Sequence, residues 1–330
     1  MKKIITSLFL STLFFSTAQT IDKSNISSGG GSSINENLDM LYTIGELNVQ
    51  EINLGNLEVS EGFINKSLKT IIQTKVFLQG PIITPSISGL MNDDLRVENY
   101  LPLISPYSDY SSVENLVFNE GGVLGDGDQK DDIVDWVWVE LRTVYDVSKR
   151  INGRSALLQR DGDIVGLDGI SPLKMEVEPN YYYVAVKHRN HLGVMTSEAI
   201  DLTINSEVTV DFTTNLLSTY SDNAQIQMES GVMALWAGKI TNAETVKFSG
   251  SENGPNVIKD YILADLSNVF NSVTFSSSGY LLIDLNLNGT AAFSGSENES
   301  NIIKDNVLAY PNNVFNSSTY FILTTIPNND

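Results

Sequence analysis

The stretch Ile133-Val134-Asp135-Trp136-Val137-Trp138-Val139-Glu140-Leu141 decides the fold class. Bulky apolar side chains occupy both alternating sets of positions, so we predict a strand that is packed on both faces. More short segments of this kind follow, with turn signals about every ten residues, and Asp161-Gly162 predicts a hairpin between two of them. The predicted strands are 155–160, 163–167, 173–177, 181–187, 198–204 and 208–212. This pattern predicts an antiparallel β-sandwich over residues 76–216.

The C-terminal part of the chain repeats itself. Residues 239–272 align with residues 284–317 at a fixed offset of 45, with 18 identities in 34 positions, where chance would give about two. In each copy a polar loop is followed by apolar residues at helical spacing: Val257, Ile258, Tyr261, Ile262 and Leu266, then Ile302, Ile303 and Val307. Asn253 and Pro255 suit the start of the first helix. We predict a small α-rich tandem module over residues 217–330 whose two helices pack together.

The loop of the second copy has the first half of a calcium-binding pattern. Oxygen-bearing side chains fall at positions 1, 3 and 5, a glycine at 6 and a backbone carbonyl at 7, as EF-hand-type loops require. Position 12 is Gly295, so a glutamate further along must close the site. The candidate ligands are Asp284, Asn286, Asn288, Thr290, Glu297 and Glu299. The alternative is an Asx-rich turn without metal.

The first copy lacks this pattern. Its equivalent positions carry Lys239, Thr241, Ala243 and Glu244. A lysine at position 1 repels a cation, and alanine supplies no ligand. We therefore expect one calcium site per chain, in the second copy only.

The balance of charged residues and the N-terminal segment indicate where the protein is located. The chain carries 40 acidic against 20 basic residues and has no cysteine, which argues against a nucleic-acid partner and excludes disulfides, thiolate metal sites and a cysteine nucleophile. Residues 1–18 have the basic start, apolar stretch and small-residue exit of a signal peptide. We interpret residues 19–37 as a flexible Ser/Gly linker and residues 38–75 as a short β-rich segment. No later run is long and apolar enough for a transmembrane helix, so we expect a protein that is secreted or held at the outer cell surface.

The tandem loop–helix units resemble dockerin modules, which bind calcium and dock to a cohesin partner. A second resemblance spans residues 76–325 and is carried by the strings Gly89-Leu90-Met91-Asn92-Asp93-Asp94-Leu95-Arg96, Ile133–Val137, Arg154–Asp163, His188–Thr196 and Ala234–Gly238. These look like a family of secreted Bacteroidetes-type proteins labelled hemagglutinin-like. The resemblance implies adhesion to an extracellular protein or cell-surface glycan. It implies no catalytic residue.

Other clusters have both functional and structural interpretations. His188 and His191 could ligate a metal or act as a base, or could be structural. Asp126, Asp128, Asp131 and Asp132 could form a second calcium site or a solvated loop. Asp93-Asp94 and Asp161/Asp163 could be paired carboxylates of a glycosidase, or they could belong to turns. Trp136, Trp138 and Tyr181–Tyr183 could form an aromatic platform for sugar rings, or they could pack in the core. We favour a non-enzymatic interaction protein; the alternative function is an ancillary component of polysaccharide degradation.

Overall fold

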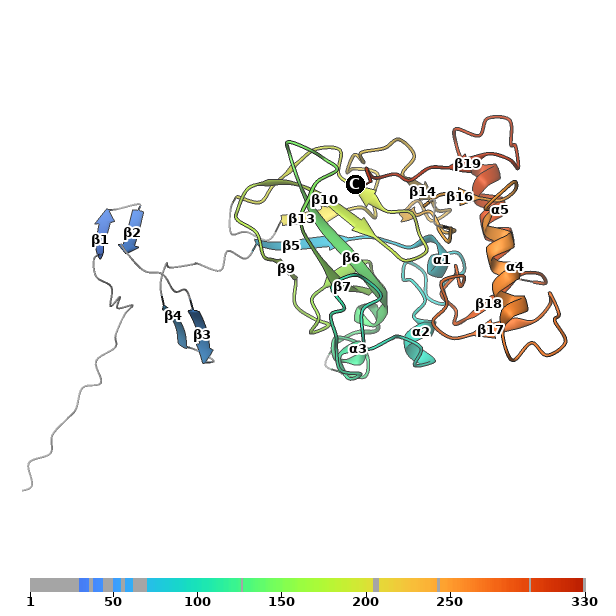
Figure 1. Ribbon diagram of the computed structural model, residues 1–330, viewed down its shortest axis with the longest axis horizontal. Helices are drawn as coiled ribbons and strands as arrows, with labels where there is room; N and C mark the ends of the chain where they lie inside the picture. Colours follow the sequence, from blue (N-terminus) through green and yellow to red (C-terminus); the bar gives the residue numbers. More distant parts are fainter. Residues whose placement is uncertain are drawn as a thin grey trace, which may run out of the picture. The chain divides into compact units, whose positions relative to one another are not determined.

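The computed structural model describes residues 30–35, 38–43, 50–54, 57–61, 70–125, 127–203, 208–241, 244–296 and 298–328. Its contacts divide the chain into two compact units, Met1–Ser67 and Leu68–Asp330. The predicted signal peptide lies outside the described residues. Each unit is described by itself below, and both are drawn in Figure 1.

The first unit contains two antiparallel hairpins. Strand β1 (Gly30–Asn35) pairs with β2 (Leu38–Thr43), and β3 (Gln50–Leu54) pairs with β4 (Leu57–Glu61). The prediction of a flexible linker over 19–37 is therefore wrong for residues 30–35. Composition misled here because strand pairing satisfies backbone donors and acceptors whatever the side chains are.

The second unit is built on one nine-stranded sheet in the order β11-β10-β6-β7-β8-β5-β13, with β12 beside β10 and β9 beside β5. All neighbours pair antiparallel except β13 and β5, which run parallel. The strands are β5 (Thr70–Lys75), β6 (Ile133–Thr143), β7 (Arg150–Gln159), β8 (Asp163–Val165), β9 (Leu173–Met175), β10 (Tyr181–Lys187), β11 (Val194–Met195), β12 (Ile200–Asp201) and β13 (Val208–Asp211).

The stretch quoted first forms the long strand β6, whose first ten residues are all buried. The predicted hairpin at Asp161-Gly162 is confirmed, because β7 and β8 pair antiparallel on either side of it and Gly162 has a φ of 90°. The mainly β, mostly antiparallel class is confirmed as well, and the sheet is open. The two-layer sandwich and the boundary at residue 216 stay predictions. Strand β5 was expected in the N-terminal segment but pairs within the main sheet, where Ile72 is fully buried.

The two repeats contain the predicted helices, α4 (Gly254–Ala264) and α5 (Glu299–Ala309), which contact each other. Asn253 caps α4 by accepting a hydrogen bond from the amide of Asn256, and Asn298 caps α5 in the same way. Their buried stripes meet in a second hydrophobic core that includes Ile258, Ile262, Ile303 and Val307. Leu266 differs from the prediction: it lies beyond the end of α4 and is 96% exposed.

Short elements complete the second unit. They are the helices α1 (Gln79–Ile82), α2 (Asp94–Val97) and α3 (Val117–Glu120), the 3-10 turn η1 (Gln129–Asp131), and the strands β14 (Gln225–Gln227), β15 (Met233–Leu235), β16 (Val246–Lys247), β17 (Ser276–Ser278), β18 (Thr290–Ala292) and β19 (Phe321–Ile322). No helix among the described residues has the length and apolar character needed to cross a membrane.

Candidate functional site

The loop of residues 284–290, which leads into β18, folds around the carboxylate of its first residue, Asp284. The backbone amides of Asn288 and Gly289 donate to Asp284, at 3.3 and 2.9 Å. The side-chain oxygen of Asn286 accepts from the amide of Asn288 at 3.1 Å, and that of Asn288 accepts from the amide of Thr290 at 2.8 Å. Leu287 and Gly289 have φ angles of 58° and 81°. These turns bring together the oxygen-bearing residues predicted at positions 1, 3, 5 and 7.

Glu299, at the start of α5, faces the same loop. It accepts a hydrogen bond from the amide of Ala292 at 2.6 Å, just beyond the loop. Asp284 and Glu299 are 0% and 1% exposed. Burial raises the pKa of Asp284 to about 7 although Arg189 lowers it, and burial together with the charge of Asp284 raises the pKa of Glu299 to about 8. Two neighbouring buried carboxylates that resist ionisation fit a site that receives a cation.

The donor set suits a hard cation such as calcium. Asp284, Glu299, the amide oxygens of Asn286 and Asn288, and the carbonyl of Thr290 would hold it, since calcium prefers oxygen ligands of mixed type. Glu297, the remaining predicted ligand, lies outside the described residues. Within the described part of the chain, no three acidic, histidine or cysteine side chains converge on one point. The site would therefore depend on amide and carbonyl oxygens. The calcium ion itself stays a prediction.

In the first copy, the positively charged side chain of Lys239 occupies the position that corresponds to Asp284. Lys239 is mostly buried, 3.7 Å from Glu244, and burial lowers its pKa. The counterpart of Glu299 is Gly254. A Cβ at Gly254 would stand 2.5 Å from the side chain of Ile303, so an apolar residue of the other copy fills the space where the closing carboxylate would lie. Ala243, one of the four predicted positions, lies outside the described residues.

Calcium titration of the full chain by calorimetry is expected to show one ion per chain. Replacing Asp284 with alanine should abolish the heat, and Glu299→Gln should weaken binding, because each change removes a charged ligand. Asp260→Asn on the exposed face of α4 is the control and should bind like the unmodified protein. Two ions per chain, or equal binding by Asp284→Ala, would contradict the assignment.

A second polar cluster lies in the core and was not predicted from the sequence. Asp135 of β6 is fully buried and accepts four hydrogen bonds. The donors are the ring nitrogen Nε2 of His188 (3.1 Å), Nε of Arg189 (3.0 Å), the hydroxyl of Tyr280 (2.7 Å) and the amide of Trp136 (2.7 Å). The one available signal was a carboxylate within a strand buried on both faces, since such a charge needs partners.

The hydrogen bonds assign the tautomers of both histidines. The amide of Gly80 donates to Nε2 of His191 at 3.1 Å, so the proton of His191 is on Nδ1. That nitrogen lies 3.0 Å from Nδ1 of His188 and 2.8 Å from the side-chain oxygen of Asn190. His188 then accepts on Nδ1 and donates from Nε2 to Asp135. Both rings are neutral and fully buried, and burial lowers the pKa of each.

This network joins the sheet to the second repeat. Arg189 donates to the carbonyl of Leu281, and its guanidinium carbon lies 4.1 Å from the ring centre of Tyr280. Asn190 donates to the carbonyls of Leu282 and Asp284, at 3.0 and 2.6 Å. The segment after β10 therefore holds the start of the 284–290 loop in place. These contacts favour the structural interpretation of the two histidines.

Most of the remaining sequence candidates have structural partners, and Asp94, whose carboxylate has none among the described residues, is the exception. Asp132 is buried beside Arg96 at 3.3 Å, and Asp128 and Asp131 cap η1, while Asp126 lies outside the described residues. Asp93 bonds Arg96 and lies 3.3 Å from Arg160; Asp163 bonds Lys75 at 2.8 Å. Trp136, Trp138 and Tyr182 are buried, Tyr183 is half-buried, and Tyr181 is 48% exposed and bonds Asp201, so the five residues do not form one exposed platform.

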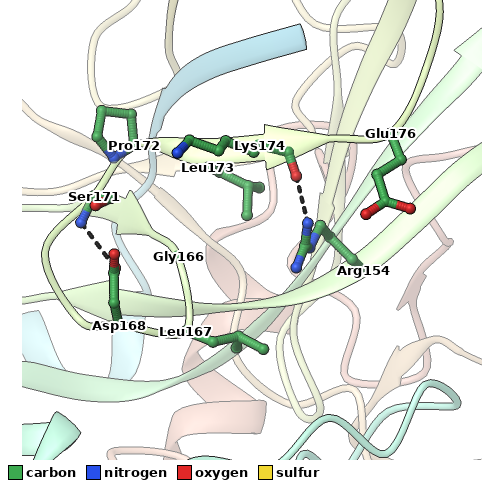
Figure 2. Close-up of a pocket in the computed structure, with 9 residues that line it drawn as sticks. All are labelled: Arg154, Gly166, Leu167, Asp168, Ser171, Pro172, Leu173, Lys174 and Glu176. Atoms are coloured by element: carbon green, nitrogen blue, oxygen red, sulfur yellow. Dashed lines mark hydrogen bonds between the residues drawn. The ribbon is translucent and has the colours of Figure 1, made fainter. Parts of the chain in front are cut away.

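A small depression of about 280 Å³ lies beside β9. Figure 2 draws the residues that line it. Arg154 points to the carbonyl of Lys174, at 2.5 Å, and Asp168 accepts from the amide of Ser171 at 2.9 Å. Arg154 and Asp168 thus each bond a neighbouring backbone group, and no hydrogen bond joins the two side chains. This geometry does not favour a reaction centre here.

Each repeat also exposes an identical apolar turn. In the first copy Asn268 is buried; its amide group donates to the carbonyls of Ile262 and Ser272, both at 2.9 Å, and its oxygen accepts from the amide of Ser272 at 2.8 Å. Asn313 makes the same three bonds in the second copy, at 2.7, 2.9 and 2.9 Å. We call these segments, 268–272 and 313–317, the stapled turns. Val269, Phe270, Val314 and Phe315 at their tips are 72%, 91%, 74% and 90% exposed.

No protein-family model matches this chain, and neither the curated proteins nor the solved structures contain a match. The dockerin-like and hemagglutinin-like resemblances therefore stay resemblances of sequence.

Proposed function

We propose that this chain is a secreted or cell-surface, non-enzymatic interaction protein that binds a protein partner through its stapled turns. The observation that carries the proposal is the duplication of one rigid turn with a phenylalanine exposed at its tip. Large exposed apolar side chains are unfavourable in water unless a partner covers them. A buried asparagine fixes each turn in advance, so little conformational entropy is lost when a partner binds.

The rest of the molecule supports this role as a scaffold. The buried asparagines that fix the turns bond the C-terminal ends of the helices, α4 and α5, so the tips are attached to the second core. A calcium ion in the 284–290 loop would stabilise the same module. The amino-acid balance, with twice as many acidic as basic residues, favours a solvated extracellular protein. The second candidate function, an ancillary component of polysaccharide degradation, would use the same turns to dock to its partner.

A binding comparison tests the proposal. The full chain, coupled to beads, is exposed to the cell-surface and secreted fractions of the producing organism, and adherence is quantified. The double variant Phe270→Ser/Phe315→Ser is expected to lose at least about tenfold in binding, because burying one phenylalanine contributes about 1.5–3 kcal/mol. Its melting temperature should be unchanged, since both side chains are exposed.

Tyr145 provides the matched control. It is 94% exposed on the loop between β6 and β7, far in sequence from either repeat. Tyr145→Ser should bind as the unmodified protein does. Equal binding by the double phenylalanine variant, or an equal loss in Tyr145→Ser, would overturn the proposal.

A further inference from the structure

A cleft of about 610 Å³ lies between the 284–290 loop and α5 on one side and α1 and the segment following it on the other. This volume is within the range of about 300–1,000 Å³ that small-molecule sites occupy. Its walls come from distant parts of the chain, including Ile83, Asp94, Met228, Asn288 and Asn301. The cleft is separate from the stapled turns, none of whose residues line it.

The walls offer hydrogen-bond donors in fixed orientations. Asn286 and Asn288 line the cleft, and their side-chain oxygens are engaged within the loop, so each NH₂ group is left without a protein partner among the described residues. Asn301 of α5 is similar: its oxygen accepts from Lys304 at 3.1 Å. The three NH₂ groups can therefore donate to a ligand.

An acceptor and an apolar surface complete the lining. The carboxylate of Asp94 has no hydrogen-bond or ion-pair partner among the described residues, and it lines the cleft from α2. Ile83, Met228 and Ile302 add apolar contacts. Hydroxyl groups both donate and accept, and sugar rings present C–H faces to apolar side chains, so this combination suits a saccharide.

The charge of the cleft selects among saccharides. Its residues include the carboxylates of Asp94, Glu229 and Asp305 but no lysine, arginine or histidine. Lys304, which does not line the cleft, is already engaged with Asp305 at 3.6 Å and with Asn301 at 3.1 Å. Sulfated, phosphorylated or sialylated sugars would therefore meet the like charges of Asp94 and Glu229 without an unengaged cation among the lining residues. Seven amide side chains line the cleft against three carboxylates, which favours an uncharged hydroxyl-rich ligand over a cationic one.

We infer that this cleft binds a neutral oligosaccharide, with Asn286, Asn288 and Asn301 donating to its hydroxyl groups and Asp94 accepting from them. The assignment goes beyond the proposed function and does not depend on it. The double variant Phe270→Ser/Phe315→Ser should keep saccharide binding, so failure of either assignment leaves the other testable.

The internal repeat supplies a matched control. Asn256 of α4 is the counterpart of Asn301, and its oxygen likewise accepts from a lysine, Lys259 at 3.3 Å, but it does not line the cleft. The backbone amide of Asn301, not its side chain, bonds the cap of α5, so Asn301→Ala leaves that cap in place.

The labelled full chain is first applied to an array of neutral, sialylated and sulfated glycans, and the strongest neutral binder is titrated by calorimetry. We expect neutral glycans to bind, Asn301→Ala and Asp94→Ala each to lower the affinity by about tenfold, and Asn256→Ala to leave it unchanged. Binding to no glycan, to acidic glycans only, or to a lysine-rich peptide in their place would overturn the inference. So would neutral-glycan binding that Asn301→Ala does not weaken.

Discussion

Replacing Asp135 with alanine is expected to lower the free energy of unfolding by about 3–5 kcal/mol, because it leaves the buried charge of Arg189 without a partner. Burial alone would raise the pKa of Asp135, but Arg189 and His188 lower it to about 2, so the carboxylate is ionised in the folded protein at neutral pH. The change also removes the acceptor of four hydrogen bonds. Denaturant unfolding of the full chain, followed by fluorescence, measures the effect.

A double variant separates the charge pair from general damage to the core. If the penalty comes from the unpaired charge, Asp135→Ala/Arg189→Met should lose less stability than the sum of the two single changes. Glu198→Ala, at an exposed position just before β12, is the control and should change stability by about 0.5 kcal/mol at most. Equal unfolding midpoints for Asp135→Ala and the unmodified protein would contradict the central place given to this carboxylate.

Acid is expected to destabilise the junction between the sheet and the second repeat through the two histidines. Their pKa values are lowered in the folded protein, by burial first. Arg189 and Lys239 lower the pKa of both rings further, His188 also lowers that of His191, and Asp135 opposes the shift of His188. The unfolded chain therefore binds more protons than the folded chain below the ordinary pKa. The stability that each neutral ring contributes is complete above about pH 6.5, and falls by about 1.4 kcal/mol per pH unit below it until the folded-state pKa is reached.

Asp284 and Glu299 act in the opposite direction when no metal is bound. Their raised pKa values mean that their contribution is complete at acid pH and is lost as the pH rises through about 7 and 8. Overall stability would mix these effects, so NMR of the imidazole protons is the sharper measurement. The chain has two histidines; both should keep neutral-form shifts as the pH falls through 6.5. Titration of either ring at or above that pH would contradict the tautomer assignment.

The sequence predicted the local structure more fully than the site. The strand at 133–141, the hairpin at Asp161-Gly162 and the capped helices follow from short-range rules: side-chain periodicity, turn preference and helix capping. The β5–β13 pairing joins residues far apart in the chain, and no periodicity reveals such a partner. The linker assignment at 30–35 has a different reason: β1 pairs with its neighbour β2 along the chain, and strand pairing does not require apolar side chains.

In the candidate site too, the sequence predicted the features within one segment and missed those that join distant segments. The spacing of Asp284, Asn286, Asn288 and Thr290 within one loop was visible in the sequence, and the structure brings these residues together. The Asp135 network combines strand β6, the segment after β10, α1 and the second repeat, so only the fold could assemble it. The stapled turns lie between these cases: their repetition was visible, but the exposure of Phe270 and Phe315 was not, because apolar residues are more often buried.

The most direct test of the central claim is site-specific photo-crosslinking. Benzoylphenylalanine is introduced in place of Phe270, Phe315 or Tyr145 in three separate full-length proteins, each irradiated with the surface and secreted fractions of the producing organism. The same protein adduct should form from positions 270 and 315 and be absent from position 145. No adduct at either repeat position, or one identical adduct at all three positions, would contradict the account.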